Sequence, residues 1–262
     1  MVPRGVLGGV TAILIAAAPL AAQGGLIDMG AAQPRVHRAG SGDGFLFTAP
    51  NVTLELRGGW NFARASSDIF SFVDSTLTLN KSDFNSLAGG AELGLRLNDR
   101  FTWLFDLGLD RTSHPSEFRD WVDQNNLPIQ QRTTLTRVPL TVGVKAYLLP
   151  PGRSVGDFAW LPSRLAVYVG AAGGIMHYQF TQHGDFVDYT NSSIFTTTYS
   201  SGSWGAIGQV LGGAELGMTK HFALDMQARY TFGSAPMNNA FVNFNAIDLS
   251  GLQTTLGLSW RL

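Results

Sequence analysis

The chain ends in Leu252-Gln-Thr-Thr-Leu-Gly-Leu-Ser-Trp-Arg-Leu262, a stretch in which apolar and polar side chains alternate up to the last residue. Leucine and tryptophan occupy even positions of this stretch, whereas glutamine, serine and arginine occupy odd positions. Successive side chains of a β-strand point to opposite faces, so this alternation predicts an amphipathic strand.

Seven other segments alternate in the same way, and together with the last one they predict about eight strands. They cover residues 52–62, 87–97, 101–110, 138–148, 165–176, 204–218 and 222–232. Asn98-Asp99-Arg100 and Thr219-Lys220-His221 are short enough to be hairpin turns, which indicates antiparallel neighbours. Two points stay open: the facing of 165–176, and whether Asp68–Asn80 adds strands to make ten.

The polar faces of these strands contain six acidic and six basic residues, whereas the apolar faces contain none. The twelve are Glu55, Arg57, Glu92, Arg96, Asp106, Asp110, Arg137, Lys145, Glu215, Asp225, Arg229 and Arg261. Reversing the faces would point Arg57, Lys145 and Arg229 at lipid, at a cost of roughly 2 to 4 kcal/mol each near the bilayer midplane. We therefore predict a lumen charge network inside a closed barrel.

A soluble β-sandwich would show the same alternation with its apolar faces inward. The positions of the aromatic residues favour a membrane barrel instead, because they gather at the strand ends as interfacial girdles do. One group is Trp60, Phe62, Trp204, Tyr230 and Phe232, and the other is Phe101, Trp103, Phe222 and Trp260. Short turns also alternate with long polar segments, at about 64–86, 112–132, 181–203 and 234–248, as periplasmic turns alternate with outer loops.

The first 22 residues have the pattern of a secretory signal peptide, with a basic start, an apolar run and a small-residue ending at Ala22. The apolar run, Val6–Ala18, is shorter than the roughly 20 residues that a membrane-spanning helix needs. We expect cleavage after Ala22, an irregular periplasmic lead-in over 23–49 and a barrel over 50–262.

The composition excludes several classes of function. A net charge of −1 argues against nucleic acid, which requires clustered Lys and Arg. The absence of cysteine removes disulfides, thiolate chemistry, cysteine-ligated metals and lipoprotein acylation. We expect no cofactor and no metal.

The order of these strands resembles a known family, and three stretches are most characteristic of it. They are Arg137–Tyr147, the glycine-rich Val167–Gly174 and the terminal Leu256–Leu262. The chain resembles the small bacterial outer-membrane β-barrel family that includes OmpA-type, OmpX-type and opacity-type barrels. The resemblance implies an all-β, closed antiparallel up-and-down transmembrane β-barrel in the outer membrane of a Gram-negative cell, with both termini periplasmic. It also implies contact with outer-membrane lipids and, during biogenesis, with the barrel-assembly machinery and periplasmic chaperones.

Three functions remain open from the sequence. The leading one is a monomeric, non-enzymatic barrel with a structural or surface-interaction role, an extracellular ligand at its loops and a lumen filled by paired charges. The second is a passive porin-like channel for small solutes. The third is an outer-membrane hydrolase, although none of the five histidines lies in a lipase or protease motif. The aromatic residues of the loops either bind a partner or pack against one another.

Overall fold

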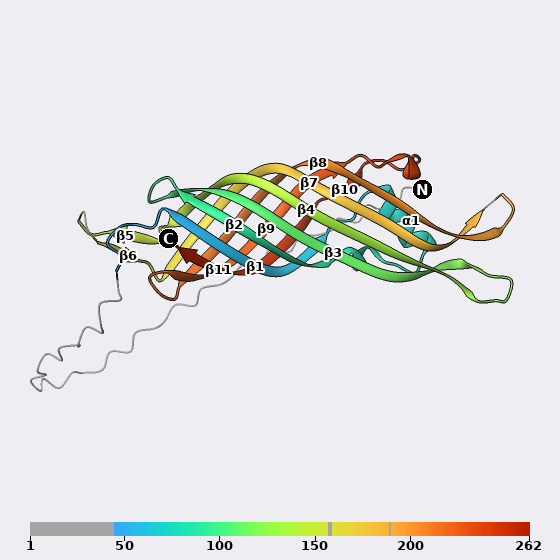
Figure 1. The fold of residues 1–262 in the computed structure, drawn as a ribbon, viewed down its shortest axis with the longest axis horizontal. Helices are drawn as coiled ribbons and strands as arrows, with labels where there is room; N and C mark the ends of the chain where they lie inside the picture. The colour runs from blue at the N-terminus through green and yellow to red at the C-terminus, as the bar shows by residue number, and fades with distance from the viewer. Residues whose placement is uncertain (1–44, 157–158, 189) are drawn as a thin grey trace, which may run out of the picture. The chain divides into compact units, whose positions relative to one another are not determined.

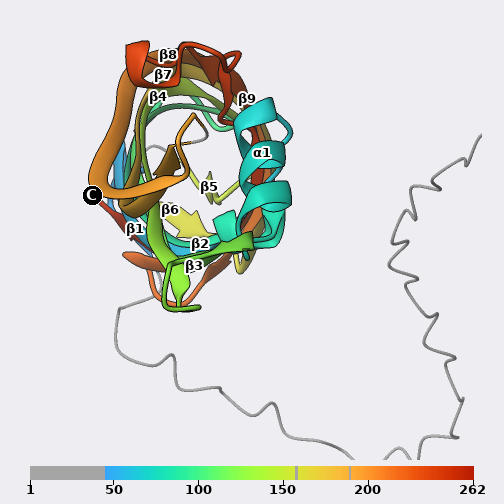
Figure 2. The same ribbon diagram turned by 90° about the vertical axis from the view of Figure 1, so that its right-hand side faces the viewer.

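Eight antiparallel strands form a closed ring in the computed structural model (Figures 1 and 2). The strands are β1 (Val52–Ala63), β2 (Ser86–Arg96), β3 (Phe101–Val122), β4 (Pro128–Leu149), β7 (Leu165–Asp188), β8 (Ser193–Gly217), β9 (Phe222–Ala235) and β11 (Gly251–Arg261). Each pairs with its neighbour in this order, and β11 pairs with β1 to close the barrel. The predicted up-and-down barrel of about eight strands is confirmed.

The structure describes residues 45–156, 159–188 and 190–262, which belong to one unit spanning Ser41–Leu262. The predicted signal peptide, 1–22, and positions 23–44 of the predicted lead-in lie outside the described residues. In the described part of the chain, no helix is long and apolar enough to cross a membrane.

The register gives each strand one inward and one outward face. In β7, whose facing the sequence left open, Ala166 and Tyr168 are buried inside, whereas Val169 is exposed outside. Pro139 has no ladder partner in β3, because proline has no backbone N–H to donate. Its ring lies against Gly108, where a Cβ atom would be 2.8 Å from it, and the pairing on either side of this gap keeps the same register.

The barrel has two ends of different construction. The end with the turns at Asn98–Arg100 and Thr219–His221 is called the turn end. At the opposite end, called the hairpin end, β3, β4, β7 and β8 continue for 22 to 25 residues, whereas the other four strands stop after 11 to 14. The expectation of loops at 112–132 and 181–203 is therefore wrong for most of these residues, which extend the hairpins as strands.

Four short elements lie on the side of the hairpin end where the short strands stop. They are α1 (Asp68–Thr76), η1 (Lys81–Phe84), η2 (Asn239–Phe241) and β10 (Ile247–Asp248), which pairs with β9. Figure 2 shows α1 beside β9, within the outline of the ring. Because Asp68–Thr76 is a helix, it adds no strands to the barrel wall, and the strand count is eight.

At the turn end a small hairpin, β5 (Gly152–Ser154) and β6 (Trp160–Pro162), lies close to the barrel mouth. Leu46 joins it as a third short strand through two backbone bonds with Trp160, of 3.0 and 2.8 Å. The side chain of Trp160 is buried and lies near the guanidinium of Arg261. The connection over 150–163, which is longer than the other turns, thus forms part of the barrel mouth.

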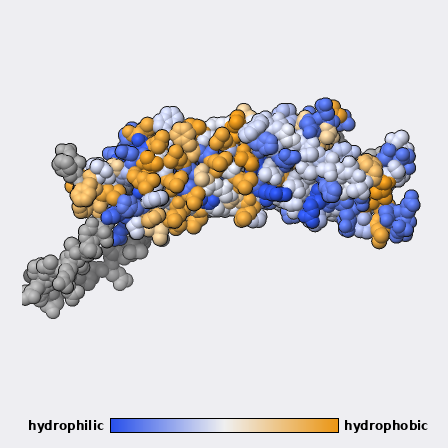
Figure 3. Space-filling model, in the orientation of Figure 1, coloured by the Kyte–Doolittle hydropathy of each residue, from blue (hydrophilic) through white to orange (hydrophobic). Residues whose placement is uncertain are grey.

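The outer surface of the turn-end half is apolar. Figure 3 shows hydrophobic side chains concentrated over this half and more hydrophilic ones over the hairpin half. Val142, for example, is 44% exposed on the outer face of β4, while its neighbour Thr141 is buried inside. An apolar outer face over a polar inner face is the pattern of a barrel that spans a lipid bilayer.

Candidate functional site: the barrel interior

The structure brings eleven of the twelve predicted lumen charges into the barrel interior, where each is at most 7% exposed. They are Glu55, Arg57, Glu92, Asp106, Asp110, Arg137, Lys145, Glu215, Asp225, Arg229 and Arg261. Arg96 is the exception among the twelve predicted lumen charges. It lies at the turn-end rim and pairs with Asp99, whose side chain is 65% exposed. Arg96 is the last residue of β2, so its side chain reaches the mouth rather than the lumen.

The central cluster consists of three carboxylates and three cations. The strand register places Glu55 directly opposite Glu92, and Glu92 directly opposite Asp106. Like charges in directly opposed positions repel each other, so this row requires cations from the rest of the wall.

The three cations come from β1, β4 and β9. Lys145 Nζ lies 2.5 Å from Glu92 Oε1, and Arg229 Nη1 lies 2.7 Å from Asp106 Oδ1. Arg57 pairs with Asp106 and also lies 3.7 Å from Glu92. Each carboxylate of the row therefore has a cation within ion-pair distance, since Lys145 also lies 3.7 Å from Glu55.

A second cluster lies towards the hairpin end. Arg137 Nε donates a hydrogen bond of 2.7 Å to Asp110, and the Ser86 hydroxyl donates one of 3.0 Å to the same carboxylate. Arg137, Asp110 and Ser86 lie on β4, β3 and β2, so these two hydrogen bonds connect three neighbouring strands.

A third cluster lies towards the turn end. Arg261 Nη2 lies 2.9 Å from Glu215 Oε2, and the Tyr147 hydroxyl donates a hydrogen bond of 2.5 Å to the other oxygen of Glu215. Asp225 accepts hydrogen bonds of 2.9 Å from the Tyr168 hydroxyl, which in turn accepts one of 2.9 Å from Gln227. Two tyrosines thus supply hydrogen bonds that the charged residues alone do not provide.

The sequence analysis did not identify Tyr147 and Tyr168 as lumen residues. Tyr147 is an odd-numbered residue of the same strand as Arg137 and Lys145. The alternation of the sequence therefore indicated that its side chain also faces inwards. Tyr168 lies on the strand whose two faces are both apolar or small, and there the alternation gave no signal.

The side chains leave little space between them. The enclosed space beside Asp110 and Arg137 has a volume of about 20 Å³, and the space at the turn-end mouth beside Tyr147 and Glu215 has about 30 Å³. Spaces of this size hold one or two water molecules. At these two places the side chains therefore leave room for little more than single water molecules.

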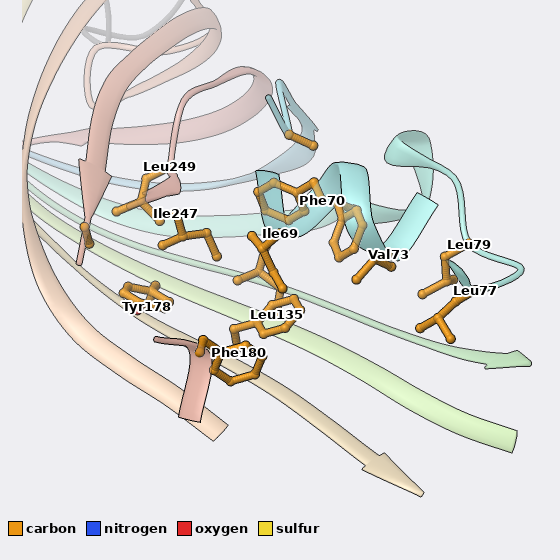
Figure 4. Close-up of a cluster of buried hydrophobic side chains, with 14 of the residues drawn as sticks. Ile69, Phe70, Val73, Leu77, Leu79, Leu135, Tyr178, Phe180, Ile247 and Leu249 are labelled. Carbon is orange, nitrogen blue, oxygen red and sulfur yellow. The ribbon is translucent and has the colours of Figure 1, made fainter. Parts of the chain in front are cut away.

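An apolar core fills the hairpin end above the charged interior. Ile69, Phe70 and Val73 fall on one face of α1 and point at the long strands (Figure 4). The Phe70 ring lies 4.6 Å from the Phe84 ring and 6.5 Å from the Phe180 ring, with edge-to-face geometry. Phe70 thus packs against Phe84 of the same connection, as one of the two interpretations of the loops expected, whereas Phe72 and Phe195 are 39% and 40% exposed.

The nine predicted interface aromatics point to the outside of the barrel. They are Trp60, Phe62, Phe101, Trp103, Trp204, Phe222, Tyr230, Phe232 and Trp260. Phe222 and Trp260 stack at the turn end with 6.3 Å between ring centroids, and Tyr230 and Phe232 lie 4.6 Å apart towards the hairpin end.

Among the described residues, the histidines show no arrangement typical of a hydrolase. His183 Nδ1 lies 2.7 Å from the Thr198 hydroxyl, His221 Nδ1 lies 3.1 Å from the Arg261 carbonyl oxygen, and His177 lies beside a tryptophan ring. His37 lies outside the described residues. In the described segments, no group of three or more His, Asp or Glu residues could hold a metal ion.

No protein-family model matches the chain. Unconventional myosin-XVB of Homo sapiens is 27% identical over an alignment of 195 positions that covers 65% of this chain and 6% of that protein. Among solved structures, the chain is similar to Neisserial surface protein A, with 13% identity, a TM-score of 0.44 and coverage of 80% of this chain and 96% of that one.

Two further solved structures are similar to the chain at comparable levels. OprG from Pseudomonas aeruginosa has 15% identity and a TM-score of 0.43, and the alignment covers 83% of this chain and 99% of that one. Ail, the attachment invasion locus protein of Yersinia pestis, has 11% identity and a TM-score of 0.42, with coverage of 82% and 100%.

Proposed function

We propose that the chain is a non-conducting barrel of the bacterial outer membrane whose role is structural and surface interaction. The observation that supports this proposal is the interior, where buried ion pairs span the barrel and an apolar core lies above them. A solute would have to separate these pairs to pass.

Barrel size supports the same proposal. An eight-stranded barrel has a lumen just wide enough for side chains, whereas water-filled porins use 16 to 18 strands. Breaking one partner of a buried ion pair costs about 3 to 5 kcal/mol, because it leaves an uncompensated charge. Opening a path through several such pairs would cost more than thermal motion supplies, so a porin-like role is the less favoured alternative.

The proposed orientation follows from the lengths of the connections. Short turns face the periplasm in barrels of this kind, and longer connections face outwards. The turn end, and with it the C-terminal residue Leu262, would then lie in the periplasm, while the β3–β4 and β7–β8 hairpins would extend from the cell surface. Recognition residues are commonly presented on such projecting segments of a rigid scaffold.

Liposome swelling tests the closed lumen. The mature chain is refolded into liposomes that are then placed in an isotonic arabinose solution. We expect swelling no faster than that of protein-free liposomes, and rapid swelling would support the porin-like alternative.

Epitope insertion tests the orientation. An epitope inserted at Asn125, between β3 and β4, is expected to bind antibody on intact cells. The same epitope at Lys220, in the turn between β8 and β9, is expected to bind only after permeabilisation. The opposite labelling would reject the proposed orientation.

A further inference from the structure

The tips of the two long hairpins enclose a cleft of about 560 Å³ at the end of the barrel. Its apolar lining includes Trp121, Val122 and Ile129 from the β3–β4 hairpin and Ile194 from the β7–β8 hairpin. Figure 3 shows apolar side chains beside the hydrophilic tips at the right-hand end of the molecule. The rest of the lining is polar or acidic and includes Asp123 and Asp185, so the cleft combines a few apolar side chains with a polar wall.

The tips around the cleft are strongly acidic. Residues 120–131 and 184–200 contain four aspartates, Asp120, Asp123, Asp185 and Asp188, but neither lysine nor arginine. Asp123 and Asp185 line the cleft itself. None of the ion pairs within the described residues involves these four aspartates, and the nearest basic residues in the sequence, Arg119 and Arg132, lie just outside the two ranges.

A free strand edge begins beside the cleft. β8 pairs with β7 along its whole length, but it pairs with β9 only from Ile207 onwards. Within the described residues, the other edge of β8 has no strand partner over 193–199. This stretch, Ser-Ile-Phe-Thr-Thr-Thr-Tyr, has high β-propensity and contains no charge and no proline.

The corresponding edge of β3 is protected, which makes the open edge of β8 distinctive. Proteins commonly protect edges with charges, proline or a covering segment. The β3 edge contains Pro115 and Arg119, and Thr78 covers it through a backbone bond of 2.8 Å to Glu117 and a hydroxyl that accepts one of 2.9 Å. Over 193–199 the β8 edge contains neither a charge nor a proline, and among the described residues the short element η2 reaches this stretch only at its end, where the Phe241 ring lies 6.4 Å from the Tyr199 ring.

We propose that the cleft and the adjoining β8 edge dock an extended polypeptide segment in which lysine or arginine alternates with apolar or aromatic residues. The main chain of the segment pairs with β8, an apolar side chain enters the cleft, and the cationic side chains face the four aspartates. The inference rests on the proposed function, because it requires the hairpin end to face outwards. The free edge favours a polypeptide over a small cation, and the aspartates disfavour an anionic membrane surface.

A defined peptide tests the proposal. The probe is an eight-residue synthetic peptide in which lysine alternates with valine and one tryptophan, labelled for fluorescence anisotropy. It is titrated onto the mature chain in lipid nanodiscs. We expect it to bind at least about tenfold more tightly than the same peptide with glutamate in place of lysine, and to bind more weakly as salt screens the charges. Methylation of its backbone amides is expected to weaken binding by at least about tenfold, because it blocks strand pairing.

Matched variants locate the site. Ile194→Lys introduces a cation where the cleft meets the open edge, and we expect it to weaken binding at least about tenfold. Leu127→Lys makes a comparable change on the tip of the other hairpin, β3–β4, outside the cleft lining and at a residue that is 58% exposed, and we expect less than about a twofold effect. Asp185→Asn is expected to weaken binding about two- to fivefold, whereas Asp99→Asn at the turn end is expected to have no effect.

Three results would overturn the inference: equal binding of the lysine and glutamate peptides, undiminished binding of the methylated peptide, or equal effects of Ile194→Lys and Leu127→Lys. The swelling assay separates this inference from the proposed function. A barrel that is closed to solutes but binds none of the peptides would overturn the docking site alone. A barrel that admits solutes would overturn the non-conducting role, whatever the peptides do.

Discussion

Arg137 on β4 and Asp110 on β3 form a buried pair, with 2.7 Å between Nε and Oδ1, at the level where the charged interior meets the apolar core. The same small space that these two residues line is also lined by Met176 and Leu249 of that core. The pair is thus in contact with both the charged interior and the apolar core, and its two side chains are only 2% and 9% exposed.

Arg137→Met is expected to destabilise the barrel by about 3 to 5 kcal/mol, because it leaves the Asp110 carboxylate buried without a cation. Adding Asp110→Leu should recover much of this loss, since both charges are then gone. Urea unfolding of the protein in lipid vesicles, followed by tryptophan fluorescence, measures the free energies. Arg96→Met, at the rim pair with Asp99, whose side chain is 65% exposed, is the control and should cost less, about 1 kcal/mol. Strictly additive costs of the two core substitutions would contradict this account of the pair.

Phe70→Ala is expected to loosen the hairpin end, because removing a fully buried phenylalanine typically costs about 3 to 5 kcal/mol. The effect should appear as faster hydrogen exchange of the α1 amides, while the strands of the turn-end half keep their protection. Phe72→Ala is the matched control on the same helix, since Phe72 is 39% exposed. Equal exchange in the two variants would show that the buried face of α1 does not hold the helix in place.

The carboxyl group of Asp248 makes the stability of the hairpin end depend on pH in the acidic range. Partial burial alone would raise the pKa of its carboxyl group, but the hydrogen bonds that it accepts from Ser66 and Ser250 hold the pKa below the usual value of 3.8. A lowered pKa means that the ionised group stabilises the fold above pH 3.8 and that this contribution is lost as the pH falls through the lower pKa of the folded state.

Amide exchange at Ser66 and Ser250, measured by NMR as the pH is lowered, tests this response. We expect protection at both amides to fall only below the ordinary range of an aspartate, and Asp248→Asn to remove the pH dependence. A transition at or above the ordinary pKa would contradict the hydrogen-bond account.

Val142→Arg tests which surface contacts lipid. Val142 lies opposite Phe105 and Gly173, far from both ends of the apolar band, and an arginine near the bilayer midplane costs roughly 2 to 4 kcal/mol. Leu97→Arg, beside the turn at Asn98, lies close to the interface and should cost at most about 1 kcal/mol. The free energy of folding into vesicles measures both, and equal costs would contradict a membrane-spanning band at Val142.

The sequence predicted the strands best where they cross the apolar band. There the outward residues contact lipid and the inward residues carry charges, so apolar and polar residues alternate clearly. Beyond the band, both faces of β3 and β4 are polar around His114 and Arg132, so the alternation disappears although the strands continue. The helix at Asp68–Thr76 was also missed. A nine-residue helix has little stability of its own and forms because Phe70 and its neighbours pack against the long strands.

The sequence predicted which charged residues face the interior better than it predicted which of them pair with each other. Parity identified the inward charges, but partners such as Asp106 and Arg229, 123 residues apart, meet only because the barrel closes. Tyr168 was hidden because β7 is apolar or small on both faces. Pairing across a closed barrel depends on strand register and side-chain length, and neither can be obtained from the alternation alone.

Single-channel recording in a planar bilayer tests the central claim most directly. The mature chain is refolded, inserted and held at a series of voltages in a symmetric salt solution. Because buried ion pairs fill the lumen and an apolar core covers it, the account predicts no stable open level after insertion. A large, long-lived conductance in the unmodified protein would contradict it.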